Sequence, residues 1–183
     1  MSAATEALCN HPVFRFFRVI SDIPRPSKHE EQISQFLFRW ARERGLEAEQ
    51  DEKLNILIRK PATPGYEGAP GIMLQAHMDM VCEKAPEAEH DFMKDPIHWE
   101  LDGDILSTGR RTTLGADDGI GVAMAMAVLD DDTLSHPALE VLFTTAEEDD
   151  FSGAEHFDVS KMTATRLINL DHANEKQILC GSC

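Results

Sequence analysis

The chain has 183 residues, 42% of them hydrophobic, and a formal net charge of −16 at pH 7. This size and hydrophobic content favour one globular domain with its own core and exclude a largely disordered protein. The acidic excess lies in residues 71–183, which argues against a nucleic acid partner.

The N-terminal sequence and the cysteines indicate the cellular location. No apolar window reaches the roughly 18 residues of a membrane span, and the N-terminus has no apolar run of signal length, so we expect a cytoplasmic protein that does not contact a membrane. Without a secretory signal, the four cysteines are expected to be reduced thiols. The CxxC pattern of Cys180 and Cys183 lacks the second pair that a zinc site needs.

Two helices are predicted first, over residues 5–21 and 28–44. Ser27 and Glu30 have the spacing of a capping box at the start of the second helix, and Gly45 is placed to end it. Its apolar residues recur at helical spacing and predict a core-facing stripe.

The rest of the chain alternates strands and helices. Strands are predicted at residues 54–60, 72–79, 139–145, 166–170 and 177–180, a hairpin that turns at Asp102-Gly103, an Ala- and Met-rich helix after residue 121, and a short helix at 153–157. This alternation predicts an α/β fold with a largely parallel central sheet.

Acidic or imidazole side chains follow three of these strands. The stretch LQAHMDMV carries His77 and Asp79 on one side of its strand, Glu147 and Glu148 follow LEVLFTTA, and Asp171 follows RLINL. Ligand crevices of open α/β sheets lie beyond the carboxyl ends of the strands, so these groups are expected to converge there.

Asp117 is a further candidate, in the stretch TLGADDGIG at the start of the Ala- and Met-rich helix. Several carboxylates in one crevice raise each other's pKa, so they need protons or a divalent cation beside them. One imidazole with several carboxylates suits zinc, with cobalt or manganese also acceptable. Two such ions about 3.5–4 Å apart could share these ligands and produce a hydroxide nucleophile.

The spacing suggests roles for the remaining acids. Asp79 is placed to accept the second N–H of the His77 imidazole and fix its orientation. Glu147 and Glu148 are adjacent and must point differently, so one can bind metal while the other serves as general base. Each feature alone has a simpler explanation: a core pair for HxD, a solvated loop for EED, a helix-start residue for Asp117.

The ordered motifs HMDMV, TTLGADDGIG, TTAEED and NLD, with IPRPSKHEEQI before them, resemble the dinuclear-zinc metallopeptidases of the carboxypeptidase G and dipeptidase type. Within this family the chain is most similar to the bacterial aminoacyl-histidine dipeptidases, also called Xaa-His dipeptidases or peptidase D. The resemblance covers residues 11–181 and implies a three-layer α/β/α catalytic domain.

The resemblance also implies site residues and a reaction. His77, Asp117, Glu148 and Asp171 would bind two zinc ions, Asp79 would orient His77, and Glu147 would be the general base. The implied reaction is hydrolysis of Xaa-His or carnosine-like dipeptides by a metal-bridging hydroxide. A related amide hydrolase, such as a deacylase or aminopeptidase, and a non-catalytic metal-binding fragment are the alternatives.

Family members extend well past this sequence. Residues 1–183 would be the N-terminal part of the catalytic domain, without its C-terminal part, the lid domain through which relatives form homodimers, and a late histidine ligand. The isolated chain is therefore expected to be inactive or weakly active. The family pattern also has Asn where this chain has Asp118.

Overall fold

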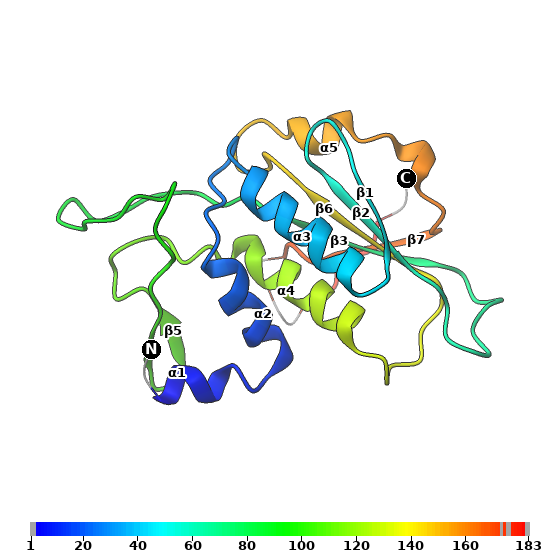
Figure 1. The fold of residues 1–183 in the computed structure, drawn as a ribbon, viewed down its shortest axis with the longest axis horizontal. Helices are drawn as coiled ribbons and strands as arrows, with labels where there is room; N and C mark the ends of the chain where they lie inside the picture. Colours follow the sequence, from blue (N-terminus) through cyan, green and yellow to red (C-terminus); the bar gives the residue numbers. More distant parts are fainter. Residues whose placement is uncertain (1–2, 173, 175–176, 182–183) are drawn as a thin grey trace.

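The computed structural model describes residues 3–172, 174 and 177–181 (Figure 1). Its helices are α1 (Ala3–Leu8), α2 (Pro12–Ser21), α3 (Glu31–Glu43), α4 (Ala116–Asp130) and α5 (Ser152–His156), with a 3-10 turn at Val159–Lys161. Its strands are β1 (Glu47–Gln50), β2 (Ile56–Lys60), β3 (Ile72–His77), β4 (Glu100–Asp102), β5 (Ile105–Ser107), β6 (Leu139–Thr144) and β7 (Arg166–Asn169). Within these described residues, no helix is long and apolar enough to cross a membrane.

Five strands form one mixed sheet in the order β1-β2-β6-β3-β7. Strand β3 is parallel to β6 on one side and to β7 on the other, while β2 is antiparallel to both β1 and β6. The predicted α/β class is confirmed, and the parallel part of the sheet is its β6-β3-β7 half. Strands β4 and β5 form a separate hairpin.

The main core lies between one face of the sheet and three helices (Figure 1). Phe17 of α2, Leu37 of α3 and Met126 of α4 are fully buried against Ile58 and Phe143 of the sheet. A smaller cluster covers the other face, where Phe157 packs with Leu57, Met73 and Leu142. The second helical layer is therefore thin, formed by the segment around α5.

The predicted first helix is interrupted. It is two helices, because Pro12 starts α2 at its first turn and His11 before it is extended, with φ −80° and ψ 128°. A residue that precedes proline is pushed away from helical backbone angles. The prediction of one continuous helix over 5–21 was wrong for this reason.

The predicted capping box at the start of α3 was also wrong. Glu30 is the N-cap residue of α3, without a side-chain capping bond. Its carboxylate accepts the backbone N–H groups of Lys28 and Ala146, and the Ser27 hydroxyl donates to Asp79. Gly45, with φ 73°, follows the end of the helix as expected.

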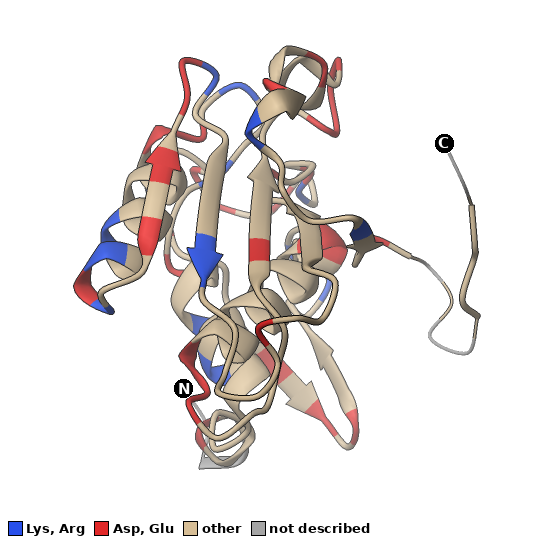
Figure 2. Ribbon diagram, turned by 90° about the vertical axis from the view of Figure 1, so that its right-hand side faces the viewer, with Lys and Arg blue, Asp and Glu red and all other residues tan. Residues whose placement is uncertain are grey.

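Three smaller expectations also change. Strand β1 was not predicted, because its sequence EAEQ lacks apolar alternation. The hairpin turns at Gly103-Asp104, one residue later than predicted, since Asp102 pairs with Ile105. Residues 177–180 form no strand; Ile178 and Leu179 are exposed, and this segment lies away from the rest of the fold (Figure 2). Cys183, half of the CxxC pattern, lies outside the described residues.

Strand β7 is at one edge of the sheet, and all four of its residues are exposed. Leu167 and Ile168 are 52% and 48% exposed. An edge strand with exposed apolar side chains offers unpaired backbone groups and apolar surface to another strand or layer.

Candidate metal centre

His77 is the last residue of β3 and is almost fully buried, with 1% of its surface exposed. In the parallel pairing of β3 with β6 it lies opposite Thr144, so the chain that follows β6 comes past the same edge. Glu147 and Glu148 are in that segment, and Asp171 follows β7, the other neighbour of β3. The sheet thus brings the predicted strand-end groups together.

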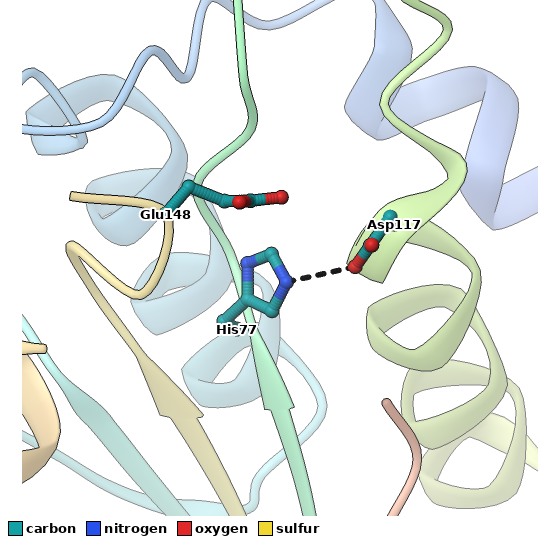
Figure 3. A group of neighbouring side chains, drawn as sticks. All are labelled: His77, Asp117 and Glu148. Atoms are coloured by element: carbon teal, nitrogen blue, oxygen red, sulfur yellow. Dashed lines mark hydrogen bonds and ion pairs between the residues drawn. The ribbon is translucent and has the colours of Figure 1, made fainter. Parts of the chain in front are cut away.

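Asp117 reaches the same edge from the start of α4. The backbone is left-handed at Gly115 and non-helical at Asp117 and Asp118, so the regular helix begins after them. The peptide bond between the two aspartates is cis. The Asp117 carboxylate points toward the imidazole, and its Oδ1 lies 3.0 Å from His77 Nε2 (Figure 3).

Two groups of side chains at this edge have the composition of a metal site. His77, Asp117 and Glu148 form one group, with a ligand atom of each within 4.8 Å of the others. Figure 3 shows the Glu148 carboxylate above the His77 ring and the Asp117 carboxylate beside it. His77, Glu147 and Asp171 form the second group, within the same distance. The three other predicted ligands and the predicted base therefore lie around the His77 imidazole.

Asp79 lies next to the ring but makes more bonds than predicted. His77 Nδ1 is 3.4 Å from Asp79 Oδ1 and 3.1 Å from the backbone carbonyl oxygen of the same residue. The carboxylate also accepts the backbone N–H groups of Glu147 and Glu148, each at 3.1 Å, and the Ser27 hydroxyl at 2.7 Å. Asp79 thus contacts both the imidazole and the turn that carries the two glutamates.

The acids change the proton affinities at the site. Burial lowers the pKa of His77, but hydrogen bonds to Asp79 and Asp117 outweigh it and raise the pKa to about 9. Burial, with neighbouring acids, raises the pKa of Glu147 and of Glu148. One imidazole among carboxylates that repel each other is a donor set that a divalent cation would neutralise, so these residues fit zinc, cobalt or manganese.

Asp118, the acid that departs from the family pattern, belongs to neither group of possible metal ligands. It is 4% exposed and accepts the backbone N–H groups of His77 at 3.3 Å and Gly121 at 3.2 Å. Burial raises its pKa to about 7, with Asp171 adding to the effect and His77 opposing it. It joins the end of β3 to the first turn of α4.

Three residues that contact the segments of the site were not predicted from the sequence: Arg25, Ser27 and Glu30. The spacing of Ser27 and Glu30 is a sequence signal, but it predicts a local helix cap rather than contacts with the site. Arg25 is 2% exposed, which is rare for an arginine and visible only once the chain is folded.

Comparisons with known proteins identify relatives of the chain by sequence and by fold. No protein-family model matches the chain. The chain is 46% identical over 174 residues to the cytosol non-specific dipeptidase of Escherichia coli K12, a match that covers 95% of this chain and 36% of that protein.

Among solved structures, the aminoacylhistidine dipeptidase from Vibrio alginolyticus superposes with a TM-score of 0.87 and 43% identity, over 90% of this chain and 33% of that one. The aminopeptidase PepT from Bacillus cereus, with a TM-score of 0.75 and 23% identity over 89% of this chain and 43% of that one, shares the fold. The chain spans about a third of the length of the two dipeptidases.

Proposed function

We propose, given that this chain belongs to the family of the cytosol non-specific and aminoacylhistidine dipeptidases, that it carries part of the active site of a metal-dependent dipeptidase. One observation supports this most directly. His77, Asp117 and Glu148, from three segments far apart in the sequence, present ligand atoms within 4.8 Å of one another in a chain of this family.

The ligands proposed from the sequence are His77, Asp117, Glu148 and Asp171. Asp117, whose Oδ1 lies 3.0 Å from His77 Nε2, would hold a cation together with that imidazole. The bound cations would supply Lewis acidity and make water a nucleophile near neutral pH. Zinc is the first choice for this donor set, with cobalt or manganese as substitutes.

Glu147 is proposed as the general base. Its Oε2 lies 3.8 Å from His77 Nε2, and its backbone N–H is held by Asp79. Burial raises its pKa, and Asp171 and Glu148 add to the effect while His77 opposes it. A carboxylate with a raised pKa can take a proton from water and return it to the leaving amine.

The remaining proposals concern the domains, the oligomeric state, the substrate and the location of the whole protein. We infer that the chain is the first part of a catalytic domain whose remaining strands cover the exposed edge of β7, and that a lid domain forms a homodimer. The substrate class is dipeptides, Xaa-His among them, and the location is the cytoplasm, as the name of the Escherichia coli relative suggests. The 183-residue chain alone is expected to have little or no peptidase activity.

The test is metal binding by this chain, measured by titration with Zn²⁺ and by elemental analysis after desalting. At least one zinc per chain is expected, with the loss of tight binding in His77→Ala. His98→Ala, which removes an exposed histidine, is the matched control. Less than one zinc per wild-type chain under metal-replete conditions contradicts the proposal.

The reaction class needs a complete protein that includes this sequence. Xaa-His dipeptides and N-acyl amino acids should be compared as substrates at equal concentration. Faster turnover of the dipeptides is expected, and faster turnover of the N-acyl amino acids would make it a deacylase instead.

A further inference from the structure

The segment of residues 25–30 contacts three of the four chain segments that carry the proposed ligands: the end of β3, the start of α4 and the turn after β6. Pro26 forms a parallel β-bridge with Met80, which places this segment alongside the chain that leaves β3. None of its residues belongs to either group of possible metal ligands. The side chains of Arg25, Ser27 and Glu30 nevertheless all reach toward the site.

Arg25 joins the His77 segment to the Asp117 segment. Its guanidinium donates to the backbone carbonyl oxygens of Met78 and Asp79, each at 3.2 Å, and to that of Gly115. A Cβ atom at Gly115 would come within 2.4 Å of the guanidinium, so the loop before α4 packs directly on Arg25. The position of Asp117 relative to His77 therefore depends on a buried side chain that contacts neither carboxylate nor ring.

Glu30 and Asp79 together hold the turn that carries the two glutamates. Glu30 Oε1 accepts the backbone N–H of Ala146 at 2.9 Å, and Asp79 accepts those of Glu147 and Glu148. Three consecutive N–H groups thus point inward at two buried carboxylates. Ala146 has φ 55°, a left-handed conformation that a non-glycine residue adopts only where its surroundings hold it.

Ser27 fixes Asp79 in turn. Its hydroxyl donates to Asp79 Oδ2 at 2.7 Å, the same oxygen that accepts from Glu148. Asp79 is 0% exposed, so no water replaces this donor if it is lost.

We propose that Arg25, Ser27 and Glu30 are positioning residues of the metal centre, which hold the segments of His77, Asp117 and the two glutamates in the arrangement that binds cations. The inference rests on the proposed function. A purely structural role would lower overall stability when these residues are changed, whereas a positioning role also weakens cation binding and loosens residues 146–148 specifically. Groups behind metal ligands typically contribute about 10- to 100-fold to metal affinity.

The experiment compares matched variants of this chain by titration with Co²⁺, followed through its visible absorption. Glu30→Ala and Ser27→Ala are each expected to weaken Co²⁺ binding by about tenfold or more and to change the spectrum. Glu30→Gln, which keeps an acceptor for Ala146, should restore most of the affinity. Arg25→Lys should weaken Co²⁺ binding too, because the single ammonium group of lysine cannot replace the planar guanidinium that donates to three carbonyl oxygens.

The controls change a buried carboxylate and a buried hydroxyl elsewhere in the fold. Glu140→Ala removes a buried carboxylate that accepts the backbone N–H groups of Thr163 and Ala164. Ser34→Ala removes a buried hydroxyl that donates to the carbonyl oxygen of Leu54. Both should bind Co²⁺ within about twofold of the wild type, whatever they do to stability.

Amide hydrogen exchange of the metal-free variants tests the positioning role independently of cation binding. Amides 146–148 should exchange faster in Glu30→Ala and Ser27→Ala, while strand β6 keeps its protection. If the wild type binds no Co²⁺, the proposed function fails, and this exchange measurement still decides the positioning role. Unchanged exchange at 146–148 in both variants overturns the inference, as does wild-type Co²⁺ affinity in both. Should Glu30→Ala fail to fold, Ser27→Ala and Ser34→Ala complete the comparison.

Discussion

Asp79 accepts a hydrogen bond from the backbone N–H of Glu147 at 3.1 Å, across 68 positions of sequence. The residue expected to orient an imidazole therefore also fixes the backbone from which the proposed base projects. The two carboxylate oxygens of Asp79 have four neighbouring donors: the Ser27 hydroxyl, the His77 ring and the backbone N–H groups of Glu147 and Glu148. Asp79 therefore does more than orient His77.

Asp79→Asn should weaken metal binding by about 10- to 100-fold and lower the free energy of unfolding by about 1–3 kcal/mol. The new amide NH₂ replaces an acceptor oxygen and faces a donor. Zn²⁺ titration and chemical denaturation of the metal-free chain measure the two effects. Asp131→Asn, which removes a carboxylate that caps Thr133 at the far end of α4, should leave metal binding unchanged. Equal metal affinity in the two variants would contradict this prediction.

Glu147→Gln in a complete protein that includes this chain should lower kcat by about 10²- to 10⁴-fold, since the amide cannot accept the proton of water. Bound metal should remain, because the proposed ligand set does not include Glu147. Steady-state kinetics and metal analysis check both parts. Glu155→Gln, at an exposed position of α5, is the control. A variant that loses its metal along with its activity would make Glu147 a ligand instead.

Glu140→Gln tests a buried carboxylate outside the site. Burial raises the pKa of Glu140, but hydrogen bonds from Ala164 and Thr163 outweigh it, and the pKa is lowered overall. The charged form therefore stabilises the folded state above the unfolded pKa of about 4.3, and this stabilisation is lost as the pH falls through the lower folded pKa.

At pH 7 the Glu140→Gln variant should be less stable than the wild type by about 1–3 kcal/mol. The difference should shrink below about pH 4. Urea denaturation at several pH values measures it, and a difference that stays constant down to about pH 2 would show that proton binding at Glu140 is not responsible.

Gly153→Ala should lower the free energy of unfolding by about 1–3 kcal/mol, because the new Cβ would meet the backbone oxygen of Thr145 at 2.2 Å. Thr145 ends the segment that leads into the glutamate turn, and it cannot move without breaking its bond to Asn55. Gly68→Ala is the control, since a Cβ added there would have no atom within 4 Å, and it should change stability by less than about 0.5 kcal/mol. Thermal unfolding of both variants gives the answer.

Most of the sheet and the strand-end acids could be predicted from the sequence. Apolar runs that end in His77, Glu147 or Asp171 need only the period of a strand and the rule that parallel strands share an edge. The edge strand β1 could not, because it is held by pairing with β2 and by ion pairs of Arg59 with Glu47 and Glu49. Neither signal is visible in EAEQ itself.

The supporting residues were missed for a related reason. Ser27 and Glu30 have the spacing of a capping box, and nothing in the neighbouring sequence distinguishes that from their actual bonds. The choice is made by Asp79 and the Ala146 N–H, which are 52 and 116 positions away. A buried charged acceptor forms a stronger bond than a helix cap in water, so the distant partners prevail.

The proposed cation ligands come from separate stretches of the chain, at the end of β3, the start of α4, the turn after β6 and the segment after β7. The proposed cation site is therefore complete only when strands β6, β3 and β7 are paired and α4 is docked on them. A cation with no affinity for the unfolded chain would not guide the early steps of folding. It would slow the reverse process and raise stability in proportion to RT times the logarithm of its concentration relative to Kd. The concentration of free cation would then set the unfolding rate, and so the lifetime, of the folded chain.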